Sequence, residues 1–265
     1  MPEAKMVALV SGSSRGIGAA TARELAARGY HVIVNYLSNS AAAKEVVKAI
    51  ETDGGSAQDI QADVCDEEQV VRLVEQVKAE HGRIDVLVCN ANTVHPPFEQ
   101  LDTLTWETFA AKVTGELTAA FFLTQQTLKI MRTRRTGRIV YVSSIDADSA
   151  AGSVAQSTAK AALNTFSRHV AGHAGLFGIT VNTVAPGSVR TEASAKVNTP
   201  ELQQYLAERS LFGRQMEPSD LGYAIAQIAD LKFAAATGQI ITIDAGMDVV
   251  GQQISPVGQR GPEED

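Results

Sequence analysis

The feature that most constrains the fold of this chain is a short apolar run leading directly into three closely spaced glycines. Val7–Val10 is typical of a buried strand, and positions 11–18 then read Ser-Gly-Ser-Ser-Arg-Gly-Ile-Gly. Glycine tolerates the positive φ that a tight turn needs, and its lack of a side chain lets other groups approach the backbone. The amphipathic stretch Gly16–Arg28 follows at once and predicts a helix. A strand, a glycine loop and a helix therefore open the chain.

Short β-branched runs alternate with longer amphipathic stretches through the rest of the sequence. We predict strands at His31–Tyr36, Ala57–Ala62, Ile84–Cys89, Gly137–Ser143, Ile179–Val184 and Gln239–Asp244, with helices at about Ala41–Thr52, Glu67–Glu80, Thr105–Arg132, Ala155–Ala174 and Pro218–Ala229. Strands separated by helices pair in parallel through right-handed crossovers. The prediction is an α/β protein: a single-domain, Rossmann-like, doubly wound parallel sheet of about seven strands with helices on both faces. It spans residues 1–251, and 252–265 form a flexible polar tail.

Composition narrows the class of partner. The chain has 265 residues and a net charge of −7, which argues against nucleic acid or an anionic membrane as the main partner. The first apolar run is too short for a signal-peptide core or a membrane span. Its two cysteines, Cys65 and Cys89, lie far apart and show no metal-ligand spacing, so we expect reduced thiols, no metal site and a cytoplasmic location.

The glycine loop predicts a nucleotide site. A helix that begins at such a loop points its free amides at a bound pyrophosphate. An NAD site would place an acid at the end of the second strand, but that strand ends Asn35-Tyr36-Leu37-Ser38. Arg15 lies in the glycine loop, where its planar guanidinium could pair with a 2′-phosphate. These two features favour NADP(H) as the cofactor.

Several further motifs follow the predicted strands in order. They are Asp63-Val64, Asn90-Ala91, Ser143-Ser144, Thr158-Ala159-Lys160, Pro186-Gly187 with Thr191, and Asp244-Ala245-Gly246. Together with the glycine loop, they resemble the short-chain dehydrogenase/reductase family along nearly the whole chain, and in detail its bacterial 3-oxoacyl-carrier-protein reductase branch. The resemblance implies a cofactor-binding set of Gly12, Ser14, Arg15, Gly16, Ile17, Gly18, Asn35, Tyr36, Ser38, Asp63, Val64, Asn90, Ala91, Lys160, Pro186, Gly187, Val189 and Thr191.

The chain departs from the family at the position of its catalytic tyrosine. In the family a Tyr-x-x-x-Lys pair transfers the proton and binds the nicotinamide ribose, and here Lys160 is present but Gln156 replaces the tyrosine. A carboxamide donates hydrogen bonds but does not give up a proton in the physiological range. Ser144, or else Ser143, matches the serine that fixes the substrate carbonyl. Ser144, Gln156, Lys160 and Glu116 are the candidate catalytic residues.

The family's fourth catalytic residue, an asparagine, is also missing. Counting back from Met131 puts Glu116 at its position, whereas counting forward from Trp106 puts Val113 there, and Asn92 stands where the family has the glycine of Asn-Ala-Gly. A buried Glu116 near Lys160 would have a shifted pKa and could act as acid or base. Other candidates for the missing acid are His95, Asp146 and Asp148, while the phenol of Tyr141 is expected in the core.

Three functions are consistent with these residues. The first is an NADP(H)-dependent reductase of a small-molecule or carrier-bound carbonyl (a ketoacyl group or similar) with a non-standard proton donor. The second is a non-redox enzyme on the same fold, such as a cyclase, dehydratase or isomerase. The third is a nucleotide-binding subunit without catalysis. The resemblance also implies a mobile substrate lid over Ser188–Ser210 and a homotetramer or homodimer formed by the two longest helices.

Overall fold

The computed structural model describes residues 5–95, 97–149, 152–192, 194, 199–247 and 249. Within them, one sheet of seven parallel strands has the order β3-β2-β1-β4-β5-β6-β7. The strands are β1 Val7–Val10, β2 His31–Tyr36, β3 Ser56–Gln61, β4 Val86–Cys89, β5 Gly137–Val142, β6 Ile179–Pro186 and β7 Ile240–Ile243. The order reverses between β1 and β4, and the carboxyl ends of strands at such a point form the usual ligand crevice of an open α/β sheet. The predicted fold class is confirmed.

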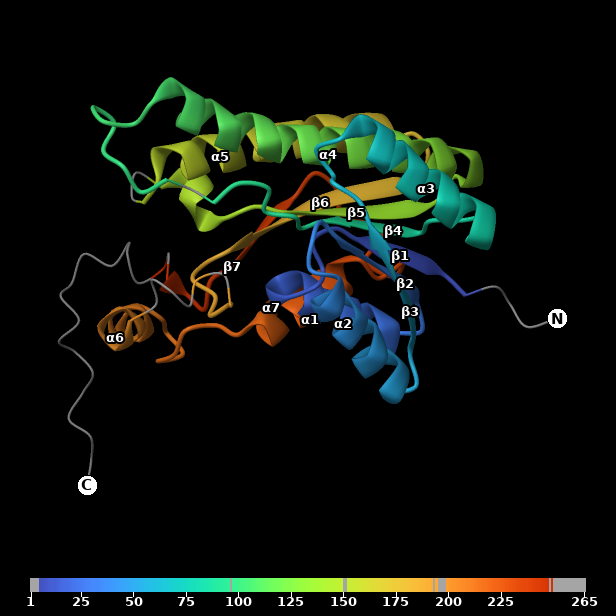
Figure 1. The fold of residues 1–265 in the computed structure, drawn as a ribbon, viewed down its shortest axis with the longest axis horizontal. Helices are drawn as coiled ribbons and strands as arrows, with labels where there is room; N and C mark the ends of the chain where they lie inside the picture. Colours follow the sequence, from blue (N-terminus) through green and yellow to red (C-terminus); the bar gives the residue numbers. More distant parts are fainter. Residues whose placement is uncertain are drawn as a thin grey trace.

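Two helical layers enclose the sheet (Figure 1). Helices α3 (Glu67–His81), α4 (Trp106–Arg134) and α5 (Val154–Gly175) cover one face, and α1 (Gly16–Ala27), α2 (Ser40–Thr52) and α7 (Pro218–Ile228) cover the other. Each layer buries its own apolar core, one around Leu87 and Ile139 and the other around Val86 and Val140. Neighbouring strand residues thus point to opposite faces and are both buried, which explains strand sequences without polar alternation.

Helix ends are fixed by capping residues at the predicted boundaries. Thr105 accepts a hydrogen bond from the Thr108 amide and starts α4, and Ser153 accepts one from the Gln156 amide and starts α5. Gly82 ends α3 with a φ of 70°, in the left-handed region that favours glycine. These caps set the rotation of α4 and α5 and therefore the direction of their inward side chains.

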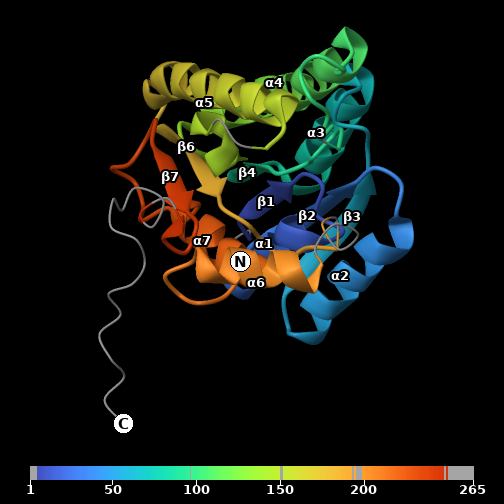
Figure 2. The same cartoon turned by 90° about the vertical axis from the view of Figure 1, so that its left-hand side faces the viewer.

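Two short helices were not predicted. Helix α6, Pro200–Glu208, begins with Thr199 as its cap and proline in its first turn, and a 3₁₀ turn, η1, spans Ile145–Asp148. Helix α6 lies beyond α7 at the left of Figure 1, and Figure 2, viewed from that side, shows it in front of the layer of α1, α2 and α7. Helix α6 falls inside the stretch Ser188–Ser210 that was expected to be a lid. Thr199 followed by Pro200 is a typical sequence for the start of a helix. The predicted tail 252–265 lies outside the described residues.

Candidate active site

Hydrogen bonds connect the glycine loop to the residues that follow β4. The Ser11 hydroxyl accepts from the amides of Asn90 and Ala91 at 3.0 and 3.1 Å, and the Asn90 amide group donates to the carbonyls of Ser11 and Gly12 at 3.0 Å each. The Ser13 hydroxyl donates to Val10 at 2.7 Å. These contacts join the ends of β1 and β4, so Asn90 and Ala91 lie where their motif predicts.

The glycines of the loop have no room for a side chain where the chain doubles back. A Cβ on Gly12 would lie 2.7 Å from the Ala91 Cα, and one on Gly18 would lie 2.5 Å from the Asn90 amide nitrogen. Gly16 has a φ of 56°, which favours glycine, and a Cβ placed on it would lie 3.6 Å from Cγ2 of Thr191. Among the described residues, no side-chain hydrogen bond caps the start of α1. This cradle of backbone with an open helix N-terminus fits a pyrophosphate.

Asn35 and Tyr36 are buried at the end of β2. The Asn35 carboxamide accepts from the Gly12 amide at 3.4 Å and donates to the carbonyls of Ile60 and Ala62 at 3.4 and 3.2 Å. Its side chain thus supports the glycine loop from inside. Arg15 and Ser38, by contrast, are exposed. The four residues at the end of β2, from Asn35 to Ser38, include no acid. A 2′-phosphate bound there would therefore meet no negative charge from them.

The remaining cofactor candidates lie beyond the ends of β3 and β6. The carboxylate of Asp63 accepts from the Cys65 amide at 2.8 Å, and Val64 is buried. Gly187 packs so closely on Asp244 that a Cβ would lie 2.8 Å from it, and Val189 pairs with Met216 in an isolated bridge. Thr191 bonds with Ser194 and faces Gly16. The structure brings these segments together at the carboxyl edge of the sheet.

Ser144 and Gln156 lie on elements that converge above β5. Ser144 caps η1, with its hydroxyl accepting from the Asp146 amide at 3.1 Å, whereas the Ser143 hydroxyl is buried beneath α5. Gln156 is half-buried in the first turn of α5, and its Oε1 is buried without a hydrogen-bond partner among the described residues. A buried carbonyl oxygen without a donor is costly, so Gln156 is suited to accept from a bound molecule or water.

Lys160 and Glu116 meet inside the protein. The Lys160 ammonium lies 2.5 Å from Oε1 of Glu116 and donates to the Val142 carbonyl at 2.8 Å. Glu116 also pairs through Oε2 with Lys112 at 2.9 Å, and Lys112 donates to the Asn92 side-chain oxygen at 2.7 Å. A continuous chain of contacts thus runs from Asn92 to Lys160. Two alignments were considered for the missing asparagine. The alignment that puts Glu116 at its position brings a carboxylate into contact with Lys160.

Charge and burial shape the protonation of this chain of contacts. Burial alone would raise the pKa of Glu116, but the ammonium groups of Lys160 and Lys112 outweigh it and lower that pKa. Burial lowers the pKa of Lys112, and the charge of Lys160 adds to this effect while Glu116 opposes it. Glu116 is therefore a carboxylate here, and Lys112 is the member whose proton is loosened.

The other acids considered from the sequence do not join this cluster. His95 and Asp148 are exposed, and Asp146 lies in the η1 turn with its backbone bonded to Ser144. Tyr141 is fully buried, with its hydroxyl 2.7 Å from that of Thr124, and burial raises its pKa well above the usual range. Tyr141 is thus a core residue, as predicted, while Glu116 is the acid in contact with Lys160.

Lys112 is the functional candidate that sequence reasoning missed. It is fully buried, whereas a lysine in a helix is ordinarily exposed, so the residue type did not predict its burial. The available signal was its spacing, because Lys112 and Glu116 stand at positions i and i+4 and share one helix face. Asn92 was noticed as a departure from the family, and it is the residue that accepts from Lys112.

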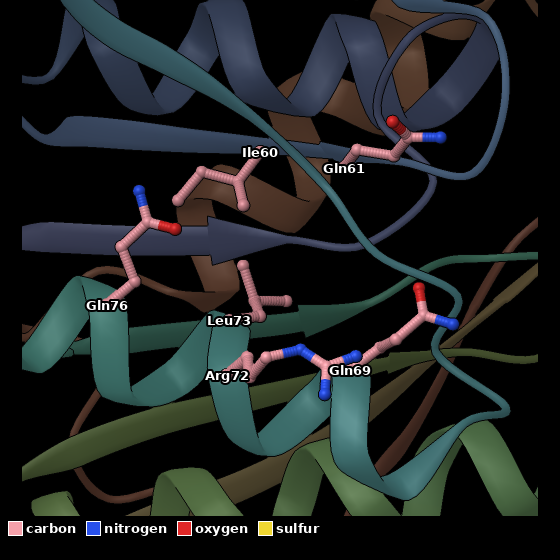
Figure 3. A pocket seen from close by; sticks show the side chains of 6 residues that line it. All are labelled: Ile60, Gln61, Gln69, Arg72, Leu73 and Gln76. Atoms are coloured by element: carbon pink, nitrogen blue, oxygen red, sulfur yellow. The ribbon is translucent and has the colours of Figure 1, made fainter.

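Two hollows lie near or beside the site. One of about 10 Å³ is lined by Glu116, Ser11, Cys89 and apolar residues of α4 and α5, and it offers at most the space of a single water. A larger groove of about 310 Å³ lies between β3 and α3. There Ile60 and Leu73 point toward each other, flanked by Gln61, Gln69, Arg72 and Gln76 (Figure 3). The larger groove contains none of the predicted site residues.

No described helix combines the length and apolar character needed to cross a membrane. The same part of the chain contains no group of three or more His, Cys, Asp or Glu side chains placed to hold a metal ion.

Comparisons with known proteins agree with this geometry. A family model described as Enoyl-(Acyl carrier protein) reductase matches residues 12–248. A 3-oxoacyl-[acyl-carrier-protein] reductase of Synechocystis sp. is 36% identical over 91% of this chain and 96% of its own length. A cis-4-hydroxycyclohexanecarboxylate dehydrogenase of Sinomonas cyclohexanicum is 35% identical over 93% and 98%. The crystal structure of gox2181 superposes with a TM-score of 0.87 at 26% identity, covering 93% of this chain and 97% of that one.

Proposed function

The chain belongs to the short-chain dehydrogenase/reductase family and is an oxidoreductase that uses a nicotinamide cofactor, and we propose that it is an NADP(H)-dependent carbonyl reductase whose proton comes from Lys160. The observation that carries this proposal is the buried contact of Lys160 with Glu116 in a site that has Gln156 in place of tyrosine. Lys160 stands one helical turn after Gln156, and its ammonium group carries protons that it can donate in place of the missing phenol.

The cofactor site supports a dinucleotide with a 2′-phosphate. The open N-terminus of α1 and the glycine cradle would hold the pyrophosphate, and Asp63, Asn90 and the segment from Pro186 to Thr191 line the rest of the crevice. The exposed Arg15 and the lack of an acid at the end of β2 favour NADP(H) over NAD(H). When bound, the nicotinamide supplies the hydride that reduces a carbonyl carbon.

Each remaining polar residue has a distinct task in this proposal. The Ser144 hydroxyl would donate to the substrate carbonyl oxygen, and the Gln156 amide nitrogen would hold that oxygen at the position where a tyrosine otherwise stands. Lys160 would donate the proton as the oxygen becomes an alkoxide, and Glu116 holds Lys160 in place. General acid catalysis of this kind typically contributes about 10²–10⁴-fold to a rate.

The substrate class follows from the relatives and not from the site itself. We propose a small-molecule or carrier-bound carbonyl, since one relative is a reductase of 3-oxoacyl groups on a carrier protein and another is a hydroxycyclohexanecarboxylate dehydrogenase. We also propose a homotetramer or homodimer. On the outer surface of α4, Phe121 is 46% exposed and packs its ring 6.4 Å from that of Phe166 on α5. An exposed phenylalanine that packs on a half-buried one in this way suits a subunit interface.

The test combines cofactor binding with turnover. NADPH and NADH would be titrated by fluorescence into wild type and Lys160→Ala, and NADPH oxidation would then be followed with a panel of ketones and carrier-bound ketoacyl groups. We expect tighter binding of NADPH than NADH, turnover in wild type, and loss of turnover in the Lys160 variant. A product formed without any change in NADPH would point to the non-redox alternative, and binding without turnover to a non-catalytic subunit.

A further inference from the structure

The buried pair of Lys112 and Glu116 extends the active site toward the surface. We propose that Lys112 is a positioning residue that stores a proton and supplies it to Lys160 through the carboxylate of Glu116. This inference rests on the proposed reductase function. Its basis is the run of short contacts from Lys112 to Glu116 Oε2 at 2.9 Å and from Glu116 Oε1 to Lys160 at 2.5 Å.

The charges of the cluster make one of its protons labile. Two ammonium groups share one carboxylate, so the fully ionised cluster carries one positive charge in excess inside the protein. Burial of an uncompensated charge is strongly unfavourable, and a group in that position releases its proton more easily. Loss of one proton leaves a neutral cluster in which one ammonium still pairs with the carboxylate. The lowered pKa of Lys112 agrees with this arrangement.

Water has little access to the middle of the cluster. Lys112 is 0% exposed, Glu116 5% and Lys160 6%, and the hollow beside Glu116 has a volume of only about 10 Å³. The other titratable groups that sense Glu116 are Cys65 and Cys89, whose thiol pKa values are raised, that of Cys89 to about 12. Both thiols therefore stay neutral, and protons reach Lys160 through its charged partners.

One end of the cluster lies next to an exposed residue. Asn92, whose side-chain oxygen accepts from Lys112 at 2.7 Å, is exposed in the loop after β4, whereas Lys112 itself is fully buried. In the proposed relay, Lys112 regains its proton between turnovers from solvent that reaches it past the side chain of Asn92. The other end is Lys160, which also donates to the carbonyl of Val142, two residues before Ser144. The cluster thus connects the surface near Asn92 with the reacting end of the site.

The transfer balances at each atom. As the carbonyl carbon gains a hydride, Lys160 gives a proton to the oxygen and becomes a neutral amine. Lys112 gives a proton to Glu116 Oε2, and the carboxyl group turns and passes that proton to the Lys160 nitrogen. Lys112 is then neutral, Lys160 is an ammonium again, and solvent near Asn92 returns the proton to Lys112. The net reaction consumes one hydride and one proton for each alcohol formed.

The test uses a variant that keeps the charge but cannot release the proton. In Lys112→Arg the guanidinium stays protonated throughout the working range, whereas Lys112→Met removes both charge and proton. We expect steady-state NADPH oxidation over many turnovers to fall by about 10²-fold in both variants, because Lys160 is no longer recharged, with loss of the wild-type pH dependence and unchanged NADPH binding. Lys48→Arg, an exposed lysine on α2, is the matched control and should behave as wild type. A Lys112→Arg rate within about twofold of wild type, with the same pH profile, would refute the relay.

A second measurement needs neither cofactor nor turnover. With lysine side chains isotopically labelled, the NMR signal of Lys112 in the protein without cofactor should titrate at lower pH than the signals of exposed lysines. Glu116→Gln should lower that titration further, because the carboxylate holds the proton on Lys112. Titration of Lys112 together with the exposed lysines would overturn the proposal. If Lys112 titrates low but wild type oxidises no NADPH with any carbonyl, the reductase assignment fails and the proton-storing cluster stands.

Discussion

The ammonium of Lys160 lies 2.5 Å from Oε1 of Glu116, although the two residues are 44 positions apart and belong to different helices. The contact closes the gap between α4 and α5 directly above the end of β5. Because Glu116 also pairs with Lys112, the same carboxylate contacts an ammonium group on each side. Two of the places where this chain departs from its family, Asn92 and Glu116, are therefore joined through Lys112, and the three residues should be tested together.

Glu116→Gln should destabilise the protein strongly. It leaves two buried ammonium groups without a countercharge, and breaking a buried ion pair in this way costs about 3–5 kcal/mol. The double variant Lys112→Met/Glu116→Gln removes one of the two charges and should recover part of that loss. Urea denaturation of the single and double variants gives the coupling. Equal stability of wild type and Glu116→Gln would show that the carboxylate does not balance this cluster.

The fold was predictable from the sequence because its signals are local. The apolar strands, the amphipathic helices and the glycine loop each depend on a few neighbouring residues, and together they indicate a parallel α/β sheet. The Lys160–Glu116 contact was only a possibility, since the distance between α4 and α5 depends on packing between distant segments. Full burial of Lys112 could not be read from its neighbours, because helical spacing places it beside Glu116 without saying which way that face turns.

Asn35→Ala should weaken cofactor binding, because it removes hydrogen bonds that hold the glycine loop in place. The variant removes the acceptor of the Gly12 amide and the donor to the carbonyls of Ile60 and Ala62, and unpaired buried groups cost about 1–3 kcal/mol. We expect lower stability together with a raised dissociation constant for NADPH. Asn39→Ala removes the cap of α2 and costs about 0.5–2 kcal/mol without touching the loop. Equal effects of the two variants on NADPH binding would exclude the bracing role.

Arg15→Ala should weaken NADPH binding by about tenfold and leave NADH binding unchanged. The expected loss corresponds to one charge-assisted hydrogen bond of about 1.4 kcal/mol at an exposed position. Arg23→Ala, an exposed arginine further along α1, serves as the control for a general change in charge. Fluorescence titration with both cofactors measures the effect. Equal weakening for NADPH and NADH would mean that Arg15 contacts a part common to both, and the preference for NADP would lose its support.

Stability should fall with acidification because of His31. Burial is the largest cause that lowers its pKa, the nearby His81 ring at 4.4 Å adds to it, and Gln58 and Glu80 oppose it weakly. The folded state therefore binds a proton at His31 less readily than the unfolded state does. Its contribution is fully present above the unfolded pKa of about 6.5 and is lost as the pH falls below that value. Urea denaturation between pH 8 and pH 5.5 should show this slope, and His31→Phe should flatten it. An unchanged slope in the variant would assign it to other groups.

Gln156→Tyr should give the chain a second route for the proton. Gln156 stands one helical turn before Lys160, so a phenol placed there would project from the same face of α5. We expect faster NADPH oxidation with carbonyl substrates, because the phenol donates a proton without the help of Lys112. Gln156→Phe supplies the ring without the hydroxyl and reports whether the site accepts the added volume.

The decisive comparison introduces Lys112→Arg into both backgrounds. With Gln156 present, the arginine variant should lose about 10²-fold in steady-state rate, because Lys160 then has to be recharged from Lys112 after each turnover. With tyrosine at position 156, the same substitution should change the rate by less than about threefold, because the phenol bypasses the relay. Such non-additivity is expected of residues that serve one step. Equal losses in both backgrounds would mean that Lys112 supports the structure of the site and supplies no proton.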